Sequence, residues 1–472
     1  MKKQSIRKSA IVLSAMVSLM ALPTAAVPSV FAASDSSFPY ALFASSAAKG
    51  AITVDAKHFT LNGNIAANGT IETGKKVNIN GKKTENAGKE MLFIGDKLTA
   101  SYFGGAEVSD GLNLSKSNIN LNKPLDVIGD ASLNGNLNLS APIKADADIN
   151  ISGNVSNVNS PVLYSEFGDI TIDCNNVNLN GIVYAPLGNV EIRANNINLN
   201  NTVIIADTIT LVSNNVNANY GKSYADAAGN VSEPRADYIH KYNSYLMNKD
   251  IDDTLDVISQ YYKLTPVDTG EYKQLNILGM YIFDIEQYEV EGYGNLSVMK
   301  TDGANQMATI VLSPFNKDLP LISTDYMFNG EAHISYIEFY GLSNDENSKD
   351  FRNVVGKLSG LTDKYAGLMS VTPTPAWYDE IRTMGLFKMT SYTDADKTAE
   401  MLNDSFRITL DASKNMPQLN AEQKAVKVAA IQQYSDNLVD KGGISTDMFK
   451  MVLGVDATKA FFNNIFFGTA RQ

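Results

Sequence analysis

The sequence predicts a multidomain protein, in which a right-handed parallel β-helix of about 20 residues per coil precedes an α/β/α sandwich with a central antiparallel sheet. One segment of the first half recurs with a fixed period, at Gly168 and again at Gly188. The period disappears after about Tyr220, and the remaining chain has the pattern of helix, then strands, then helix again. We therefore expect a signal peptide over 1–32, a parallel β-helix over 33–220, a linker over 221–235 and the α/β/α domain over 236–472.

The N-terminus has the parts of a secretory signal. A basic start is followed by an apolar run from Ala10 to about Leu22 and by a segment of small residues that ends at Ala32. The apolar run is shorter than the roughly 20 residues that span a bilayer. We expect cleavage after Ala32 and a secreted or cell-surface protein with no membrane span afterwards. A retained N-terminal anchor is the alternative.

The composition argues against several classes of function. A net charge of −12 over 472 residues disfavours a nucleic-acid partner. Cys174 is the only cysteine, which excludes an intrachain disulfide and a metal site with several thiolates. The three histidines, His58, His240 and His333, lack metal-ligand spacing, and nucleotide-binding loops are absent. We therefore expect no metal and no organic cofactor.

Within each repeat apolar and polar residues alternate, which is typical of short strands with one buried face. In the coil "GDITIDCNNVNLNG", Ile172 and Cys174 face inward and Asp173 faces outward. The Asn pair marks a bend, and stacked asparagines can form ladders from coil to coil. Cys174 is thus a small inward residue, and His58 is a bend residue where other repeats have Asn. Residues 40–220 leave room for roughly nine coils.

These short, Asn-rich repeats resemble the bactofilin-type and other exported β-solenoid modules of bacteria. The segment "FPYALFASS" after the signal resembles exported proteins of Gram-positive bacteria. Modules of this kind are spacers, polymerising units or surface-attached rods. The resemblance implies a cell-wall or glycan contact, or self-assembly through the β-helix, and no catalysis in the coils.

The second half contains three landmarks in order. A strand leads through Pro314 to "DLP" at 318–320 and on to a second aspartate, Asp325. The segment "PAW" ends at Trp377, and an apolar "IFF" follows near the C-terminus. These residues resemble the ferredoxin-dependent bilin reductase family over 236–472. The resemblance implies reduction of a linear tetrapyrrole with ferredoxin electrons and without an organic cofactor.

The same resemblance implies a proton donor at Asp325 and ligand contacts from Ile310, Asp325 and Trp377. The apolar surroundings of Asp325 favour this role independently, because burial raises the pKa of a carboxyl group. Glu338, on the next predicted strand, is a candidate for a second catalytic carboxylate.

Several features depart from the family. Its assisting histidine, counted back without gaps, would lie at Ala308, and its Asn-Asp pair would fall on Gly442 and Gly443. Residues 236–472 carry 21 Lys and Arg against 32 Asp and Glu, a net charge of −11 that would repel an acidic ferredoxin. Export would also separate the protein from cytosolic ferredoxin.

Three functions therefore remain open. In the first, a β-solenoid rod carries a domain that binds a tetrapyrrole, either a bilin or a haem-derived ligand, or a similar molecule. In the second, the domain is an oxidoreductase that reduces a bilin with Asp325 as proton donor and takes electrons from a donor other than ferredoxin. In the third, the chain is a structural surface or assembly protein without a ligand.

Overall fold

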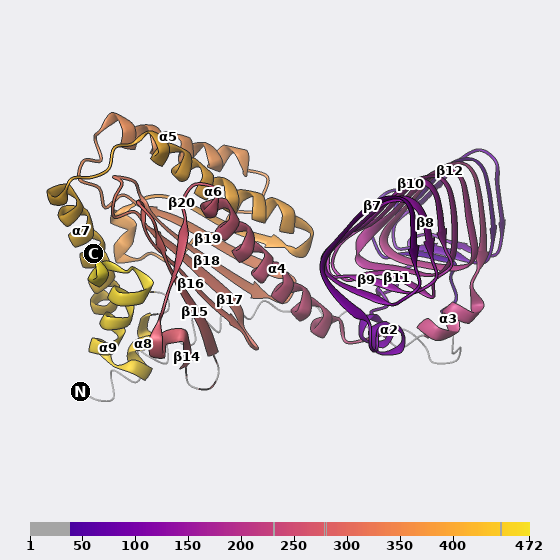
Figure 1. Cartoon of the computed structure of the whole chain (residues 1–472), viewed down its shortest axis with the longest axis horizontal. Coiled ribbons are helices and arrows are strands. Elements are labelled where there is room, and N and C mark those ends of the chain that lie inside the picture. Colours follow the sequence, from indigo (N-terminus) through magenta and orange to yellow (C-terminus); the bar gives the residue numbers. More distant parts are fainter. Residues whose placement is uncertain (1–37, 230–231, 278, 280, 444–445) are drawn as a thin grey trace. The chain divides into compact units, whose positions relative to one another are not determined.

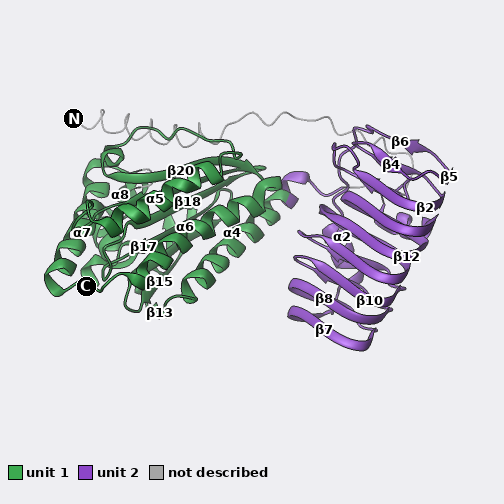
Figure 2. Cartoon of the chain, turned by 90° about the horizontal axis from the view of Figure 1, so that it is seen from above, with its two compact units in different colours: residues 1–24, 239–472 green, residues 25–238 purple. Residues whose placement is uncertain are grey.

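The computed structural model describes residues 38–229, 232–277, 279, 281–443 and 446–472. The expected signal peptide, 1–32, lies outside these residues. The chain divides into two compact units, with the boundary between Tyr238 and Ile239 (Figure 2). In the order of the sequence, the first is drawn purple and labelled unit 2 in that figure, and the second is drawn green and labelled unit 1. No helix in the described part is long and apolar enough to cross a membrane.

The first unit is a solenoid of parallel strands that wind around one apolar core (Figure 1). This confirms the prediction of a parallel β-helix, and its handedness stays a prediction. The elements are β1 (Leu42–Ala44), β2 (Ile52–Asn62), β3 (Ile65–Ala67), β4 (Ile71–Thr73), β5 (Val77–Asn80), β6 (Lys83–Thr84), α2 (Gly95–Tyr102), β7 (Glu107–Leu121), β8 (Leu125–Leu139), β9 (Ile143–Ala145), β10 (Ile149–Val158), β11 (Val162–Ser165), β12 (Ile170–Tyr220) and α3 (Lys222–Ala228).

The alternating residues take the expected sides of the solenoid wall. Ile172 is fully buried and Asp173 is exposed. Outside the core, asparagine side chains form ladders from coil to coil, as in the row Asn176, Asn196 and Asn215, with Nδ2 to Oδ1 distances of 3.0 Å at both steps. In each ladder the neutral side-chain amides hydrogen-bond to one another. Because no charges repel, the coils can stack closely.

The solenoid has about seven turns, fewer than the nine expected. Residues 85–106 leave the coil pattern, because this segment forms α2 and packs on the outer side of the wall. Its apolar residues Leu92, Phe93 and Leu98 are buried there against outward-facing Tyr164 and Tyr184. The backbone N–H of Ile94 donates to Tyr184 Oη at 3.0 Å, and that hydroxyl donates to the Leu92 carbonyl at 3.0 Å.

The segment expected to be a linker, 221–235, is partly folded. Its helix α3 buries Ala225 and Ala228 in the same outer cluster. The polar and glycine-rich composition of the segment gave no indication of this apolar contact, which the two alanines make.

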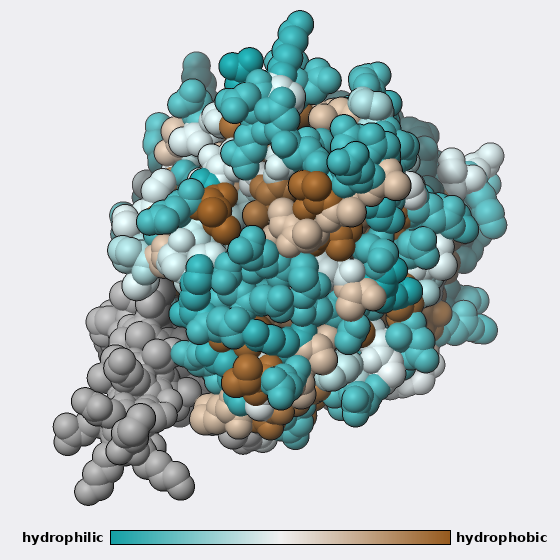
Figure 3. Space-filling model, turned by 90° about the vertical axis from the view of Figure 1, so that its left-hand side faces the viewer, coloured by the Kyte–Doolittle hydropathy of each residue, from teal (hydrophilic) through white to brown (hydrophobic). Residues whose placement is uncertain are grey.

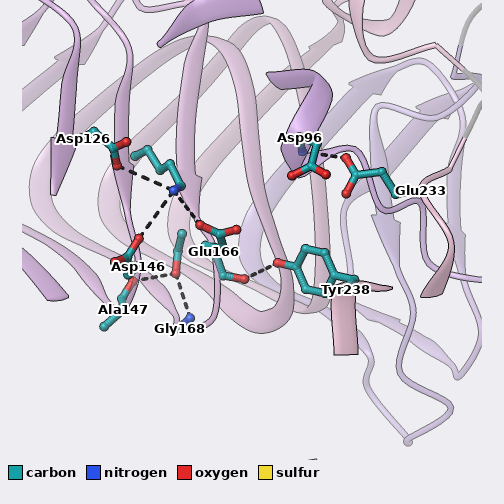
Figure 4. Close-up of polar contacts among 10 residues, drawn as sticks. Asp96, Asp126, Asp146, Ala147, Glu166, Gly168, Glu233 and Tyr238 are labelled. Atoms are coloured by element: carbon teal, nitrogen blue, oxygen red, sulfur yellow. Dashed lines mark hydrogen bonds and ion pairs between the residues drawn. The ribbon is translucent and has the colours of Figure 1, made fainter. Parts of the chain in front are cut away.

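A charged cluster lies on one row of short strands in the same unit. Asp126, Asp146 and Glu166 converge on Lys144 Nζ at 3.6, 3.5 and 2.6 Å (Figure 4). The side chains of Lys144 and Glu166 are only 11% and 13% exposed, so this ion pair is largely shielded from water. Each carboxylate comes from a different turn or strand end, and the lysine therefore ties successive coils together.

The coils are not stacked in the order of the sequence. The last coil of β12 pairs with β2, with Ile209 opposite Ile52 and Asn219 opposite Asn62. The short strand β1 lies between β12 and β3 and completes that last coil. The N-terminal coils thus continue the C-terminal end of the solenoid, which leaves β7 at one end and β4 to β6 at the other.

The core position of Cys174 gives a direct chemical test. Burial, together with the charge of Asp173, raises the pKa of the Cys174 thiol to about 11, and the residue is 4% exposed. We expect no reaction with a thiol reagent at about pH 8 in the native protein and complete reaction after denaturation. Rapid labelling of the folded protein would contradict the inward position of this residue.

The second unit contains an eight-stranded antiparallel sheet in the order β13-β15-β16-β17-β18-β19-β20, with β14 beside β15. This confirms the predicted central antiparallel sheet among helices. The elements are α4 (Arg235–Ser259), β13 (Leu264–Val267), β14 (Gln274–Ile277), β15 (Tyr281–Val290), β16 (Gly294–Asp302), β17 (Gln306–Ser313), β18 (Leu321–Asn329), β19 (Ala332–Tyr340), α5 (Lys349–Lys364), the short 3-10 helix η2 (Trp377–Glu380), β20 (Arg382–Ser391), α6 (Ala395–Asn415), α7 (Ala421–Lys441), α8 (Thr446–Leu453) and α9 (Val455–Phe461).

Each face of the sheet packs against a different group of helices. Ile310, Ile337 and their neighbours form a core with α4, α5 and α6. Val311, Leu321 and Tyr340 belong to a second core with α7, α8 and α9. On the side seen in Figure 3, apolar residues form small separate patches in a mainly hydrophilic surface.

Candidate ligand site on the sheet

Strand β18 is buried on one face and partly accessible on the other. Thr324 and Tyr326 are buried toward α4 and α6, whereas Ser323, Asp325 and Met327 retain accessible surface. This alternation follows from the period of two along a strand. Helices α7, α8 and α9 therefore cover this face incompletely and leave Asp325 partly accessible.

Within the described residues, the Asp325 carboxylate accepts one side-chain hydrogen bond. Thr309 lies directly opposite on β17, and its Oγ1 donates to Asp325 Oδ1 at 2.6 Å. Desolvation raises the pKa of Asp325 to about 6, although the Thr309 hydrogen bond acts in the opposite direction. Among the described residues no cation lies within ion-pair distance of this carboxylate. Asp325 can therefore exchange a proton at mildly acidic to neutral pH.

A second carboxylate lies on the same face, one strand away. Glu338 lies opposite Ser323 on β19, and Tyr336 lies opposite Asp325. Arg382 Nη1 donates to Glu338 Oε1 at 2.8 Å and forms an ion pair with Asp379 Oδ1 at the same distance. Burial, and then the charge of Asp325, raises the pKa of Glu338, and Arg382 only partly offsets this.

Aromatic side chains border the two carboxylates. Tyr340 packs against Tyr434 and Tyr378 with ring centroids 4.6 and 6.2 Å apart, and Trp377 lies 6.0 Å from Tyr434. Trp377 Nε1 donates to the carbonyl oxygen of Gly442 at 2.8 Å. Burial and then the charges of Glu338 and Asp325 raise the pKa of Tyr378 above its usual range. The three tyrosines are buried, and of this aromatic group Trp377 is the partly exposed member.

The structure brings together only some of the residues expected at the site. Asp325 and Glu338 share a face, and Trp377 lies at its aromatic border. Ile310 is fully buried on the opposite face and is not placed with them. Ala308 lies on that opposite face too, across from Tyr326.

A histidine at 308 would therefore not lie beside Asp325. The neighbour of Asp325 on its own face is Thr309. Arg382 had been missed; the only signal was the spacing of Asp379 and Arg382 in "DEIR". Gly442 and Gly443, where the family's Asn-Asp pair was expected, follow α7, and Gly442 contacts Trp377 instead.

Another buried carboxylate lies across the sheet. Asp250 of α4 is 8% exposed, and burial raises its pKa to about 7. It lines a cavity of about 10 Å³ with Tyr326 and Ser335, whose hydroxyl groups are buried and have no hydrogen-bond partner among the described residues. A space of this size accommodates about one water molecule and no larger ligand. In the described chain, no group of three His, Cys, Asp or Glu residues could hold a metal ion.

Comparisons with known proteins reveal only distant likenesses. No protein-family model matches the chain, and no curated protein matches it. Phytochromobilin synthase from tomato, solved in complex with biliverdin, is 14% identical with a TM-score of 0.42, and the match covers 48% of this chain and 84% of that one. An ice binding protein from an Antarctic biological consortium is 12% identical with a TM-score of 0.26, over 41% of this chain and 95% of that one. Neither score is high enough to support a functional conclusion, and nothing here supports the expected likeness of the solenoid to bactofilins.

Proposed function

We propose that the second unit binds a linear tetrapyrrole, or a similar elongated conjugated ligand, at the partly accessible part of the sheet around Asp325. The observation that carries the proposal is the largely desolvated carboxylate of Asp325, which is partly accessible and has Thr309 as its one hydrogen-bond partner in the part of the chain that the structure describes. A buried charge without a cation is costly to maintain for stability alone. A ligand with N–H donors would supply the missing hydrogen bonds.

The surroundings of Asp325 fit this class of ligand. Trp377 is partly exposed and offers a flat aromatic face on which a conjugated ligand can stack, and the buried rings of Tyr340 and Tyr378 support it from behind. Pyrrole N–H groups and lactam oxygens need both acceptors and donors, and Asp325 with a pKa near 6 can act as either. The landmarks Pro314, Asp325 and Trp377 support the same class through their resemblance to bilin reductases.

We further propose that the protein is exported and that the solenoid carries the binding unit at the cell surface or into the medium. The signal-like N-terminus supports this proposal. Reduction of the bound bilin, with Asp325 as proton donor, is the second candidate. It is favoured by the raised pKa of Asp325 and disfavoured by Thr309, which cannot take the part of a protonated imidazole. A purely structural role without a ligand is the third.

Replacing Asp325 by asparagine should change the spectrum of a bound pigment more than its affinity. Asparagine preserves the shape of the side chain but cannot deliver or accept the proton that sets the charge of the pigment. We expect the absorption of biliverdin bound to the wild type to titrate near the pKa of about 6, and the Asp325→Asn variant to lose this transition. The measurement is an absorption titration of the full chain with biliverdin, haem and bilirubin.

Asp284→Asn is the matched control, because Asp284 is exposed on β15 of the same sheet. It should leave both spectrum and affinity unchanged. If no tetrapyrrole alters the spectrum, the structural role becomes the better account. Efficient turnover of biliverdin with an artificial electron donor would instead favour the reductase.

A further inference from the structure

Both ends of the solenoid have unpaired strand edges. Among the described residues β7 pairs with β8 alone, β4 and β5 pair with β2 alone, and β6 pairs with β3 alone. Core residues are less covered at these ends. Leu112 and Leu114 in β7 are only partly buried, whereas their partners Ala131 and Leu133 in β8 are fully buried. An open edge above an uncovered core is a surface to which another strand can add.

The two ends of the solenoid carry residues of opposite charge at a position that is apolar in the coils between them. Along one row of strands this inward position is apolar in each inner coil, and its members are Leu125, Ile143, Leu163, Val183, Ile204, Leu42 and Ile65. The row ends in Glu107, which pairs with Leu125 at one end, and in Lys83, which pairs with Ile65 at the other. Only the terminal coils thus have charge at this position, and the charges are of opposite sign.

We propose that a second copy of this chain stacks head to tail on the first, with its β7 coil against the β4 to β6 coil. Continuing the observed register would place Leu112 beside Ile71 and Ile119 beside Val77. It would also place Asn120 beside Asn78 and extend the asparagine ladder. Glu107 of one copy would then meet Lys83 of the other.

The protein already contains one contact of this kind. The coil of β1 and β2 is separated from the end of β12 by more than a hundred residues of chain, yet it docks on that end with a complete parallel ladder. Asn62 Nδ2 donates to Asn219 Oδ1 at 2.7 Å across this contact. A coil from elsewhere can therefore close an open end of this solenoid, and a second copy presents the same kind of coil.

The charges select the direction of stacking. Contact between two β7 ends would bring Glu107 against Glu107, and contact between two β6 ends would bring Lys83 against Lys83. Both arrangements place like charges together, which is unfavourable, whereas the head-to-tail arrangement pairs opposite charges. At present Lys83 pairs with Glu85 at 3.3 Å and Glu107 with Lys123 at 2.7 Å, and both ion pairs are exposed and weak. Lys83 Nζ also donates to the Ile71 carbonyl oxygen at 3.0 Å, and the Ile71 N–H donates to Glu85 Oε1 at 2.7 Å. Stacking would replace these two side-chain hydrogen bonds of Ile71 by the backbone ladder of the second copy.

Charge reversal tests the proposal in the full chain. We expect sedimentation and light scattering of the wild type to show a mass that rises with concentration through dimers to longer chains, because a head-to-tail contact does not close. Glu107→Lys and Lys83→Glu should each weaken association at least about tenfold. An equimolar mixture of these two variants should associate again, since each supplies the end charge that the other needs. The double variant should associate with itself.

Asp173→Lys, on an exposed position of an inner coil, is the control and should associate like the wild type. Recovery in the mixture cannot come from misfolded variants, and circular dichroism of each variant verifies the fold. A wild type that stays monomeric at all concentrations would overturn the proposal. So would single variants that associate like the wild type, or a mixture that does not recover.

Discussion

Replacing Ile172 by aspartate should unfold the solenoid. Ile172 is fully buried between Ile151 and the next coil. Removing its side chain costs about 2–5 kcal/mol, and placing an unpaired carboxylate in the apolar core adds several kcal/mol more. Together these approach the total stability of a typical domain, about 5–15 kcal/mol. We expect loss of the β-sheet circular dichroism signal and rapid proteolysis of this unit.

The neighbouring residue provides the matched control. Asp173 faces solvent, and Asp173→Lys should change the stability by no more than about 0.5 kcal/mol. Ile192→Asp, at the equivalent position one coil on, should behave like Ile172→Asp. Equal sensitivity at Ile172 and Asp173 would show that the strand faces are assigned incorrectly.

The sequence predicted those parts of the solenoid that depend on local pattern. Alternation within a repeat determines which side of the wall each residue occupies, and the outcome for Ile172 and Cys174 confirms it. The order of the coils depends instead on contacts between distant segments. No repeat in the sequence indicates that β1 closes the last coil of β12, or that 85–106 crosses the outer side of the wall.

The candidate site shows the same limit. The strand around Asp325 and its apolar setting could be recognised from the residues alone. The neighbour of Asp325 could not be recognised in this way, because its pairing with Thr309 depends on the register of two strands, and a shift of one residue turns the opposite face of a strand toward the site. Arg382 reaches Glu338 from the next strand, so its role too depends on register.

Replacing Arg382 by methionine should destabilise the second unit by about 3 kcal/mol at neutral pH, since it leaves the buried Glu338 without its cation and close to the charge of Asp325. The side chains of Glu338 and Arg382 are 7% and 14% exposed, so solvent screens this pair only slightly. Trp377 is the only tryptophan of the chain and lies in this unit, so its fluorescence during urea unfolding reports the unit separately. Arg407→Met, on an exposed position of α6, is the control and should have little effect.

The loss should depend on pH in a defined direction. The folded pKa of Glu338 is already above its usual value of 4.5, and removal of Arg382 raises it further. Folding therefore favours the protonated form in both proteins, and the unfolded pKa of 4.5 is common to both. The extra destabilisation should be small at pH 4.5 and below, grow as pH rises through the folded pKa of Glu338 in the wild type, and level off above the higher folded pKa in the variant. Arg382 also forms an ion pair with Asp379, so a further substitution at Glu338 is needed to isolate the contribution of that carboxylate. Adding Glu338→Gln to the Arg382→Met variant should remove this pH dependence and recover part of the stability. The guanidinium carbon of Arg382 lies 4.9 Å from the centroid of the Phe387 ring. A destabilisation that is equal at all pH values would mean that Arg382 acts through this packing and not through the charge of Glu338.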